Sequence, residues 1–213
     1  MKSGRLTLVR AWAGVHPTRS ALILLAVATL LSLTGARAAI DNLGFLLFDT
    51  PVPLLLLVPV LAAVAVAMGS DNTARLPLPQ PPRLACARLL WLLTLTALAA
   101  CASNLGQLAD PVVDWQPTTR NLLLYTSLTI TTATLASPAL AWLPPVTLTV
   151  VAMFFGYRTT QPGYHWWATI MEQATSPAQW SCATASFLVA ALLHTVHPVT
   201  TSHIGSFTAA SAR

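Results

Sequence analysis

The stretch 121–157, NLLLYTSLTITTATLASPALAWLPPVTLTVVAMFFGY, decides the fold, because it contains no Asp, Glu, Lys or Arg. A hydrocarbon core of roughly 30 Å takes about 20 apolar residues in helical form. The stretch is therefore nearly long enough for two membrane spans joined by a tight turn. Pro138 and the pair Pro144-Pro145 bracket that turn, since proline disfavours helix in the residue before it. The second of these spans is short, so it is thin, tilted into a protected groove, or broken before the outer face.

The composition of the whole chain agrees with a membrane protein. Hydrophobic residues make up 55% of the 213 residues and charged residues only 8%, with a mean hydropathy of +0.66. Soluble domains keep about a quarter of their residues charged. The net charge is +5, but the bases are scattered singly and are not interleaved with aromatics. This pattern predicts contact with lipid and no nucleic-acid partner.

Outward from the central stretch, apolar runs separated by polar segments predict six spans in one transmembrane domain, residues 1–213. The fold class is therefore all-α and polytopic. A polar, proline-rich connection lies at 69–83, and a polar outer loop at 104–119. The six predicted spans are residues 21–40, 51–68, 85–105, 121–137, 142–157 and 180–197.

Basic residues predict the orientation, because cytoplasmic loops are enriched in Lys and Arg. The side of the membrane that holds the N-terminus has more basic residues than the other side. The first set is Lys2, Arg5, Arg10, Arg19, Arg75, Arg83 and Arg88, and the second is Arg37, Arg120 and Arg158. We therefore expect a multi-pass cell-membrane protein with both termini in the cytoplasm. Ala36-Arg37-Ala38 resembles a signal-peptide cleavage site. The long basic region before it favours an uncleaved first span.

The N-terminal arm, residues 1–19, reads as an amphipathic cytoplasmic helix. Leu8, Trp12 and Val15 share one side, and Arg10 lies opposite. Pro17 separates the arm from the first span. Such a helix floats in the inner membrane interface or docks a cytoplasmic partner. Leu8, Trp12 and Val15 are the candidate docking residues.

The fourth span is rich in hydroxyl side chains. Ser127, Thr131 and Thr134 are the candidates for a substrate path through the membrane. Small hydroxyl residues also let helices pack closely in lipid, and their hydroxyls can bond back to their own backbone. Both interpretations, path and packing, fit the pattern.

An aromatic segment precedes the last span. Tyr164, Trp166, Trp167 and Glu172 are the candidates for an outer gate above a cavity. The spacing of Trp167, Ile170 and Met171 predicts a short re-entrant-like helix on or in the outer leaflet. Anchoring at the membrane interface, where Tyr and Trp are enriched, is the simpler alternative.

Motifs for catalysis and cofactor binding are missing from the sequence. It has no GxxxxGK[ST], HExxH or GxSxG motif. His194 and His197 share a helical face, but no carboxylate or cysteine neighbours them. Cys86, Cys101 and Cys182 lie in or beside apolar stretches and are expected to be small packing residues. We therefore predict no enzyme, no cofactor and no metal site.

Several short motifs resemble those of a known transporter class. They are Asp114-Trp115, Arg120-Asn121, Trp142-Leu143-Pro144-Pro145, Phe155-Gly156 and Trp166-Trp167. With the arm, the six spans and the aromatic segment, the chain resembles membrane subunits of ABC exporters of the ABC-2 permease type. It is similar in particular to small actinobacterial six-span proteins that accompany separate ABC ATPases. The resemblance implies a separate ATPase subunit, a homo- or hetero-dimer, and export of a small or amphipathic compound. A membrane scaffold or immunity protein without a transport cycle is the alternative.

Overall fold

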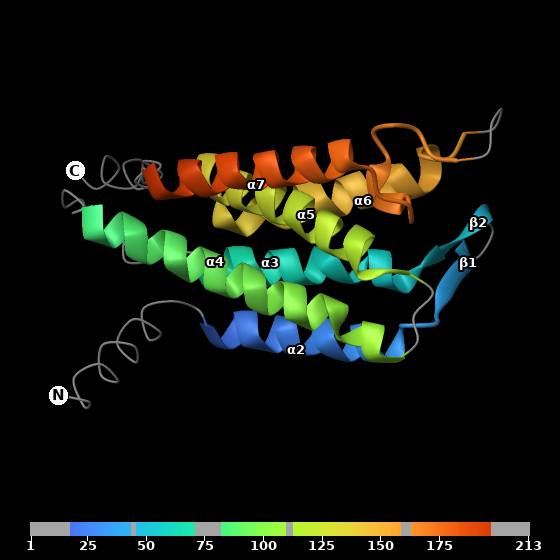
Figure 1. The fold of residues 1–213 in the computed structure, drawn as a ribbon, viewed down its shortest axis with the longest axis horizontal. Coiled ribbons are helices and arrows are strands. Elements are labelled where there is room, and N and C mark those ends of the chain that lie inside the picture. Colours follow the sequence, from blue (N-terminus) through green and yellow to red (C-terminus); the bar gives the residue numbers. More distant parts are fainter. Residues whose placement is uncertain (1–17, 44–45, 71–81, 110–112, 159–162, 197–213) are drawn as a thin grey trace, which may run out of the picture.

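The computed structural model describes residues 18–43, 46–70, 82–109, 113–158 and 163–196. Within these ranges the chain forms six α-helices that run side by side along the long axis of the molecule (Figure 1). Their bounds are α2 Thr18–Thr34, α3 Val58–Ser70, α4 Pro82–Asn104, α5 Trp115–Leu135, α6 Leu143–Phe155 and α7 Pro177–Val196. The predicted arm and its docking residues Leu8, Trp12 and Val15 lie outside the described residues.

The bundle is built around α5. Its largest interface is with α7, and it also packs extensively against α3, which in turn contacts α2 and α4. The buried core at this centre includes Leu122, Tyr125 and Ile130 of α5 and Val66 of α3. By contrast, α6 packs mainly against α5 and the 3-10 turn η4, Thr169–Met171, and forms no comparable interface with α3. The bundle therefore has five closely packed helices and one loosely attached helix.

Hydrophobic length and surface both suit a membrane. Three helical stretches are long and apolar enough to cross one: Ala85–Ala109, Pro138–Phe155 and Pro177–Val196. Large apolar side chains such as Leu90, Phe155 and Leu192 are 60% exposed or more on the outside of the bundle. Soluble monomers rarely expose such extensive apolar surface. The fold is that of a helical membrane protein.

The connection between the first two described helices differs from the prediction, because residues 39–43 and 46–53 form paired strands and include the expected end of span one and start of span two. Strand β1, Ala39–Leu43, pairs antiparallel with β2, Leu46–Pro53. The hairpin extends from one end of the bundle (Figure 1). The fold is mainly helical, as predicted, and this two-stranded hairpin is an addition that we did not predict. Pro53 is extended, with φ −61° and ψ 130°; it ends β2 and directly precedes the 3-10 turn η1, Leu54–Leu56.

The predicted outer loop 104–119 is also shorter than expected. A 3-10 turn, η2, Leu105–Ala109, follows α4, and α5 already begins at Trp115. Gly106 fits here because a Cβ would lie 2.2 Å from the carbonyl oxygen of Ser32, while the Ser32 hydroxyl accepts from the Gly106 N–H at 2.8 Å. The early start of α5 removes Arg120 from the loop bases and places it inside a helix.

The last two helices agree well with the sequence. The break around Pro138 is confirmed as a 3-10 turn, η3, Pro138–Leu140, and the helix after it is short. The three cysteines are free and exposed, so they are not buried as the small packing residues that we expected. Within the described residues, α2 starts and α7 finishes at the same end of the bundle, opposite the hairpin (Figure 1).

Candidate functional site

A folded segment joins α6 to α7 at the hairpin end of the bundle, and we name residues 163–176 the aromatic cover (Figure 1). It turns back at Gly163, whose φ of +124° is strained for other residues. Two backbone bonds fasten it to the end of α6: His165 N–H to the Gly156 oxygen at 2.7 Å, and Arg158 N–H to the Gly163 oxygen at 3.0 Å. The cover is therefore an ordered part of the fold.

Arg120 of α5 lies directly beneath the cover and is completely buried. Its guanidinium donates to three backbone carbonyls of the cover. Nη2 donates to the Glu172 oxygen at 2.8 Å and to the Thr169 oxygen, and Nη1 donates to the Ala174 oxygen at 3.3 Å. Buried charges need such partners, because unpaired they are very costly. Arg120 therefore holds the cover by its backbone.

Asn121, also fully buried, extends this set of bonds. Its Oδ1 accepts from Nε of Arg120 at 3.2 Å and from Nη2 at 3.1 Å. Its Nδ2 donates to the Ile170 oxygen at 2.6 Å. The two neighbouring side chains together satisfy four carbonyls of one short segment, from Thr169 to Ala174.

Gln179 connects this set of bonds to the start of α7. Gln179 and Ser176 form a reciprocal capping box: Ser176 N–H donates to Oε1 at 3.1 Å, and Gln179 N–H donates to the Ser176 hydroxyl at 3.3 Å. The same Oε1 accepts from Nη1 of Arg120 at 2.8 Å, while Nε2 donates to the Glu172 carboxylate at 2.7 Å. Gln179 therefore bridges a cation and an anion. We name Arg120, Asn121, Glu172 and Gln179 the polar clamp.

The predicted gate residues occupy different surroundings in the cover. Trp166 is 81% exposed, whereas Trp167 is half-buried and stacks on His165 with ring centroids 6.1 Å apart. Tyr164 meets Tyr157 edge to face at 5.6 Å. Glu172 belongs to the polar clamp. The four thus lie in one segment, but only the two tryptophans line a cavity together.

The segment was predicted to form a short helix on or in the outer leaflet, and this placement is wrong. Residues 169–171 form a single 3-10 turn, and Ile170 and Met171 are each 1% exposed. These side chains pack into the protein core, not into lipid. The reason is that Arg120 and Asn121 draw the backbone of the turn onto α5.

The predicted path residues are separated along α5. Ser127 is buried, and its hydroxyl donates to the Leu124 oxygen of its own helix at 2.7 Å. Thr131 is half-buried. Thr134 shares a hydrogen bond with Nδ1 of His194 at 3.3 Å, joining α5 to α7. The contacts of Ser127 and Thr134 are those of helix packing, which was the second interpretation of the pattern.

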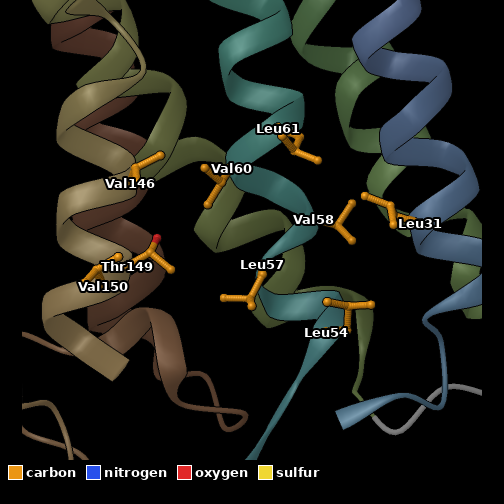
Figure 2. A pocket seen from close by; sticks show the side chains of 9 residues that line it. All are labelled: Leu31, Leu54, Leu57, Val58, Val60, Leu61, Val146, Thr149 and Val150. Atoms are coloured by element: carbon orange, nitrogen blue, oxygen red, sulfur yellow. The ribbon is translucent and has the colours of Figure 1, made fainter. Parts of the chain in front are cut away.

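Three apolar cavities adjoin α6. The first, of about 460 Å³, is lined by Leu128 of α5 and by residues of α6 that include Leu143 and Val151. The second, of about 410 Å³, lies under the cover between α5, α6 and α7, and its lining includes Trp166, Trp167, Gln179 and Cys182. The third, of about 260 Å³, lies between α3, α6 and α2 (Figure 2). We name the third the α3–α6 cavity. It is lined by Leu31, Leu54, Leu57, Val58, Val60, Leu61, Val146, Thr149 and Val150.

Sequence reasoning did not find the polar clamp. Asn121 and Gln179 were not among the candidate residues, and Arg120 was treated as a loop base. One signal was present: Arg120 directly precedes the uncharged stretch 121–157, where a charge is either at the membrane surface or buried with partners. Its partners are mainly backbone carbonyls, which no residue pattern marks.

The chain matches no protein-family model, and no curated protein or solved structure matches it. The features of this chain that bear on its function are therefore the polar clamp, the cover that the clamp holds, and the loosely attached α6 with a cavity on either side.

Proposed function

We propose that the chain is the membrane subunit of an ABC exporter, crossing the bilayer six times with both termini in the cytoplasm and driven by a separate ATPase. Its cargo is a small or amphipathic compound, and it works as a homo- or hetero-dimer. The resemblance of its motifs to ABC-2 permeases supports this proposal. The alternative, a scaffold or immunity protein, needs no moving helix.

One observation carries the proposal: α6 is fastened at its ends and loosely packed along its length. At one end it follows η3, and at the other it is bonded to the cover through Gly156. Between these points the Tyr125 hydroxyl lies 2.8 Å from that of Thr149, and cavities flank the helix on both sides. Transport requires an element with two arrangements, and motions are favoured where packing is sparse. Among the described helices, α6 is the best candidate.

The first test locks α6 in place. In a chain whose three cysteines are replaced by serine, Val60→Cys and Val146→Cys are joined by a bifunctional thiol reagent across the α3–α6 cavity. Inside-out vesicles carrying the chain and its co-purified ATPase are then assayed for uptake of a neutral lipophilic dye. We expect ATP-dependent uptake to fall to the level without ATP, and a reducing agent to restore it.

A matched control joins helices that are already bonded. Cross-linked Thr134→Cys and His194→Cys connect α5 and α7 where Thr134 and His194 are in contact, and should leave uptake unchanged. Equal uptake with and without ATP in the uncross-linked protein would reject the exporter and favour the scaffold.

Topology and coupling have separate tests. Single cysteines at positions 71 and 172 should be labelled from opposite faces of the membrane, with Glu172→Cys reacting from outside. Changing Trp12 and Val15 to Asp should abolish stimulation of the ATPase, since the arm is the expected docking surface. Labelling of both cysteines from one side would disprove the six-span topology.

A further inference from the structure

The α3–α6 cavity has a nearly uniform chemical lining. Eight of its nine lining residues are Leu or Val, contributed by α2, η1, α3 and α6. Figure 2 shows Val146, Thr149 and Val150 on α6 facing Leu57, Val60 and their neighbours on η1 and α3, with Leu31 of α2 beyond. Leu54 and Leu57 lie at the end of the cavity that is nearest the hairpin. This lining favours apolar groups and disfavours polar ones.

The one polar side chain of the lining has no proton left to donate into the cavity. Thr149 Oγ1 donates its only proton to the Pro145 oxygen at 2.7 Å, so Tyr125, 2.8 Å away, donates to it and one lone pair of Oγ1 is left. A buried water needs two to four polar partners, and apolar cavities without them stay dry. A polar ligand would lose its hydration and gain at most one hydrogen bond from these side chains.

We propose that the α3–α6 cavity binds one hydrocarbon chain of an amphiphile that enters from the surrounding bilayer. The cavity volume of about 260 Å³ exceeds the roughly 150 Å³ of apolar cavities that hold a benzene molecule. Each methylene group moved from water into such a site gains about 0.8 kcal/mol, but from lipid it gains mainly close packing. The site is therefore selective for shape, and its occupant is a flexible chain already dissolved in the membrane.

This inference goes beyond the proposed exporter function, because it requires only that the helices lie in a membrane. It also explains how α6 can lie apart from α3 without a void between them. Protein interiors and lipid are both closely filled, and an empty gap forfeits dispersion contacts on both walls.

Photochemical labelling tests the site. The full chain is reconstituted in nanodiscs of phosphatidylcholine in which a small fraction carries a diazirine on one acyl chain. After irradiation, peptides are mapped by mass spectrometry. We expect adducts on the segments 54–61 and 146–150 that persist when excess unlabelled lipid is added after reconstitution.

Filling the cavity should remove these adducts. The double variant Val60→Phe, Val146→Phe should lower labelling of both segments at least tenfold relative to lipid-exposed α7. Val189→Phe, at a position 57% exposed on α7, is the matched control and should leave it unchanged. A melting curve for each variant verifies folding, and if the double variant unfolds, Val146→Phe alone is used. Equal labelling in filled and control variants would show boundary lipid only and overturn the proposal.

A second arm identifies the source of the chain. A diazirine-bearing free fatty acid is compared with the labelled phosphatidylcholine at equal membrane content. Preferential labelling of the two segments by either supports the site and names its amphiphile. No ATP or partner subunit is present in the labelling experiment, so a failure of site-specific labelling leaves the exporter proposal open. In the same way, a failure of ATP-dependent uptake leaves the cavity proposal open.

Discussion

The two sides of α5 hold their neighbours in different ways. Toward the cover and α7, Arg120 and Asn121 make at least seven hydrogen bonds. Their partners are the backbone of the cover, the side chain of Gln179 at the start of α7, and each other. All of these bonds are buried or partly buried. Toward α6, the side chain of Tyr125 forms a hydrogen bond with that of Thr149 at 2.8 Å. Directional hydrogen bonds fix an element in one place, whereas an apolar helix face can shift against its neighbour and repack. The difference teaches that the cover is the fixed part of this end and α6 the adjustable one.

The largest expected effect comes from removing the cation of the polar clamp. Arg120→Leu leaves the carbonyls of Glu172 and Ala174 without the donor that Arg120 provides, and each buried unsatisfied group costs about 1–3 kcal/mol. The Thr169 oxygen loses one donor and keeps the N–H of Glu172 at 3.1 Å. We expect the free energy of unfolding to fall by at least about 3 kcal/mol. Equilibrium unfolding in mixed micelles measures this. Arg19→Leu, at an exposed position at the start of α2, is the control and should change stability little. A loss of stability as small as that of the control would show that Arg120 does not hold the cover firmly.

Asn121→Asp should have the next largest effect. The carboxylate can still accept from Arg120, but it can no longer donate to the Ile170 oxygen. Leaving that carbonyl unpaired should lower stability by about 2 kcal/mol. The same unfolding assay measures it. Asn121→Ala removes both roles and should be worse than Asn121→Asp. A loss of stability for Asn121→Asp no larger than that of Arg19→Leu would show that the bond to Ile170 contributes nothing.

Gly156→Ala tests a point where α6 and the cover are closely fitted. A Cβ at position 156 would lie 2.2 Å from the Ala152 carbonyl oxygen of α6 and 2.7 Å from the Ala168 Cβ of the cover, both too close for real side chains. Forcing the two apart should cost about 1–2 kcal/mol and loosen the cover. Limited proteolysis near residue 165, together with the melting temperature, reports both effects. An unchanged proteolysis rate would mean that the contact at Gly156 does not hold the cover.

The smallest effect is expected on the α6 side. A double-mutant cycle with Tyr125→Phe and Thr149→Val should give a coupling energy of about 1 kcal/mol, typical of a neutral hydrogen bond. The unfolding assay in mixed micelles again provides the values. A coupling energy as large as the effect of Arg120→Leu would show that α6 is held as firmly as the cover.

Much of the helical framework could be predicted from the sequence, because long apolar runs and proline breaks report directly on lipid exposure and backbone geometry. The turn at Pro138 and the last helix are examples. The pairing of strands 39–43 and 46–53 could not be predicted, since their apolar residues resemble the ends of two spans. Whether all six helices cross the membrane stays a prediction.

The candidate site was predictable only in part. The aromatic segment stood out by its composition, so Trp166, Trp167 and Glu172 were found. Arg120 was misplaced because a cation near an apolar run ordinarily marks a loop, and its true partners are carbonyl oxygens of residues 169–174. The α3–α6 cavity is a failure of two helices to pack, and a pattern within either helix cannot reveal it.

The spacing along the chain between Arg120 and its acceptors has a consequence for biosynthesis. Thr169 and Ala174 are synthesised 49 and 54 residues after Arg120. In the proposed six-span topology, α5 would until then enter the membrane with an unaccompanied cation and many hydroxyls, which makes it a poor span on its own. Stable insertion of α5 must therefore await the cover and α7. A nascent chain arrested between residues 140 and 165 should still be extractable or degradable, whereas one that has passed residue 179 should not. The final quarter of the protein thus completes the insertion of its middle.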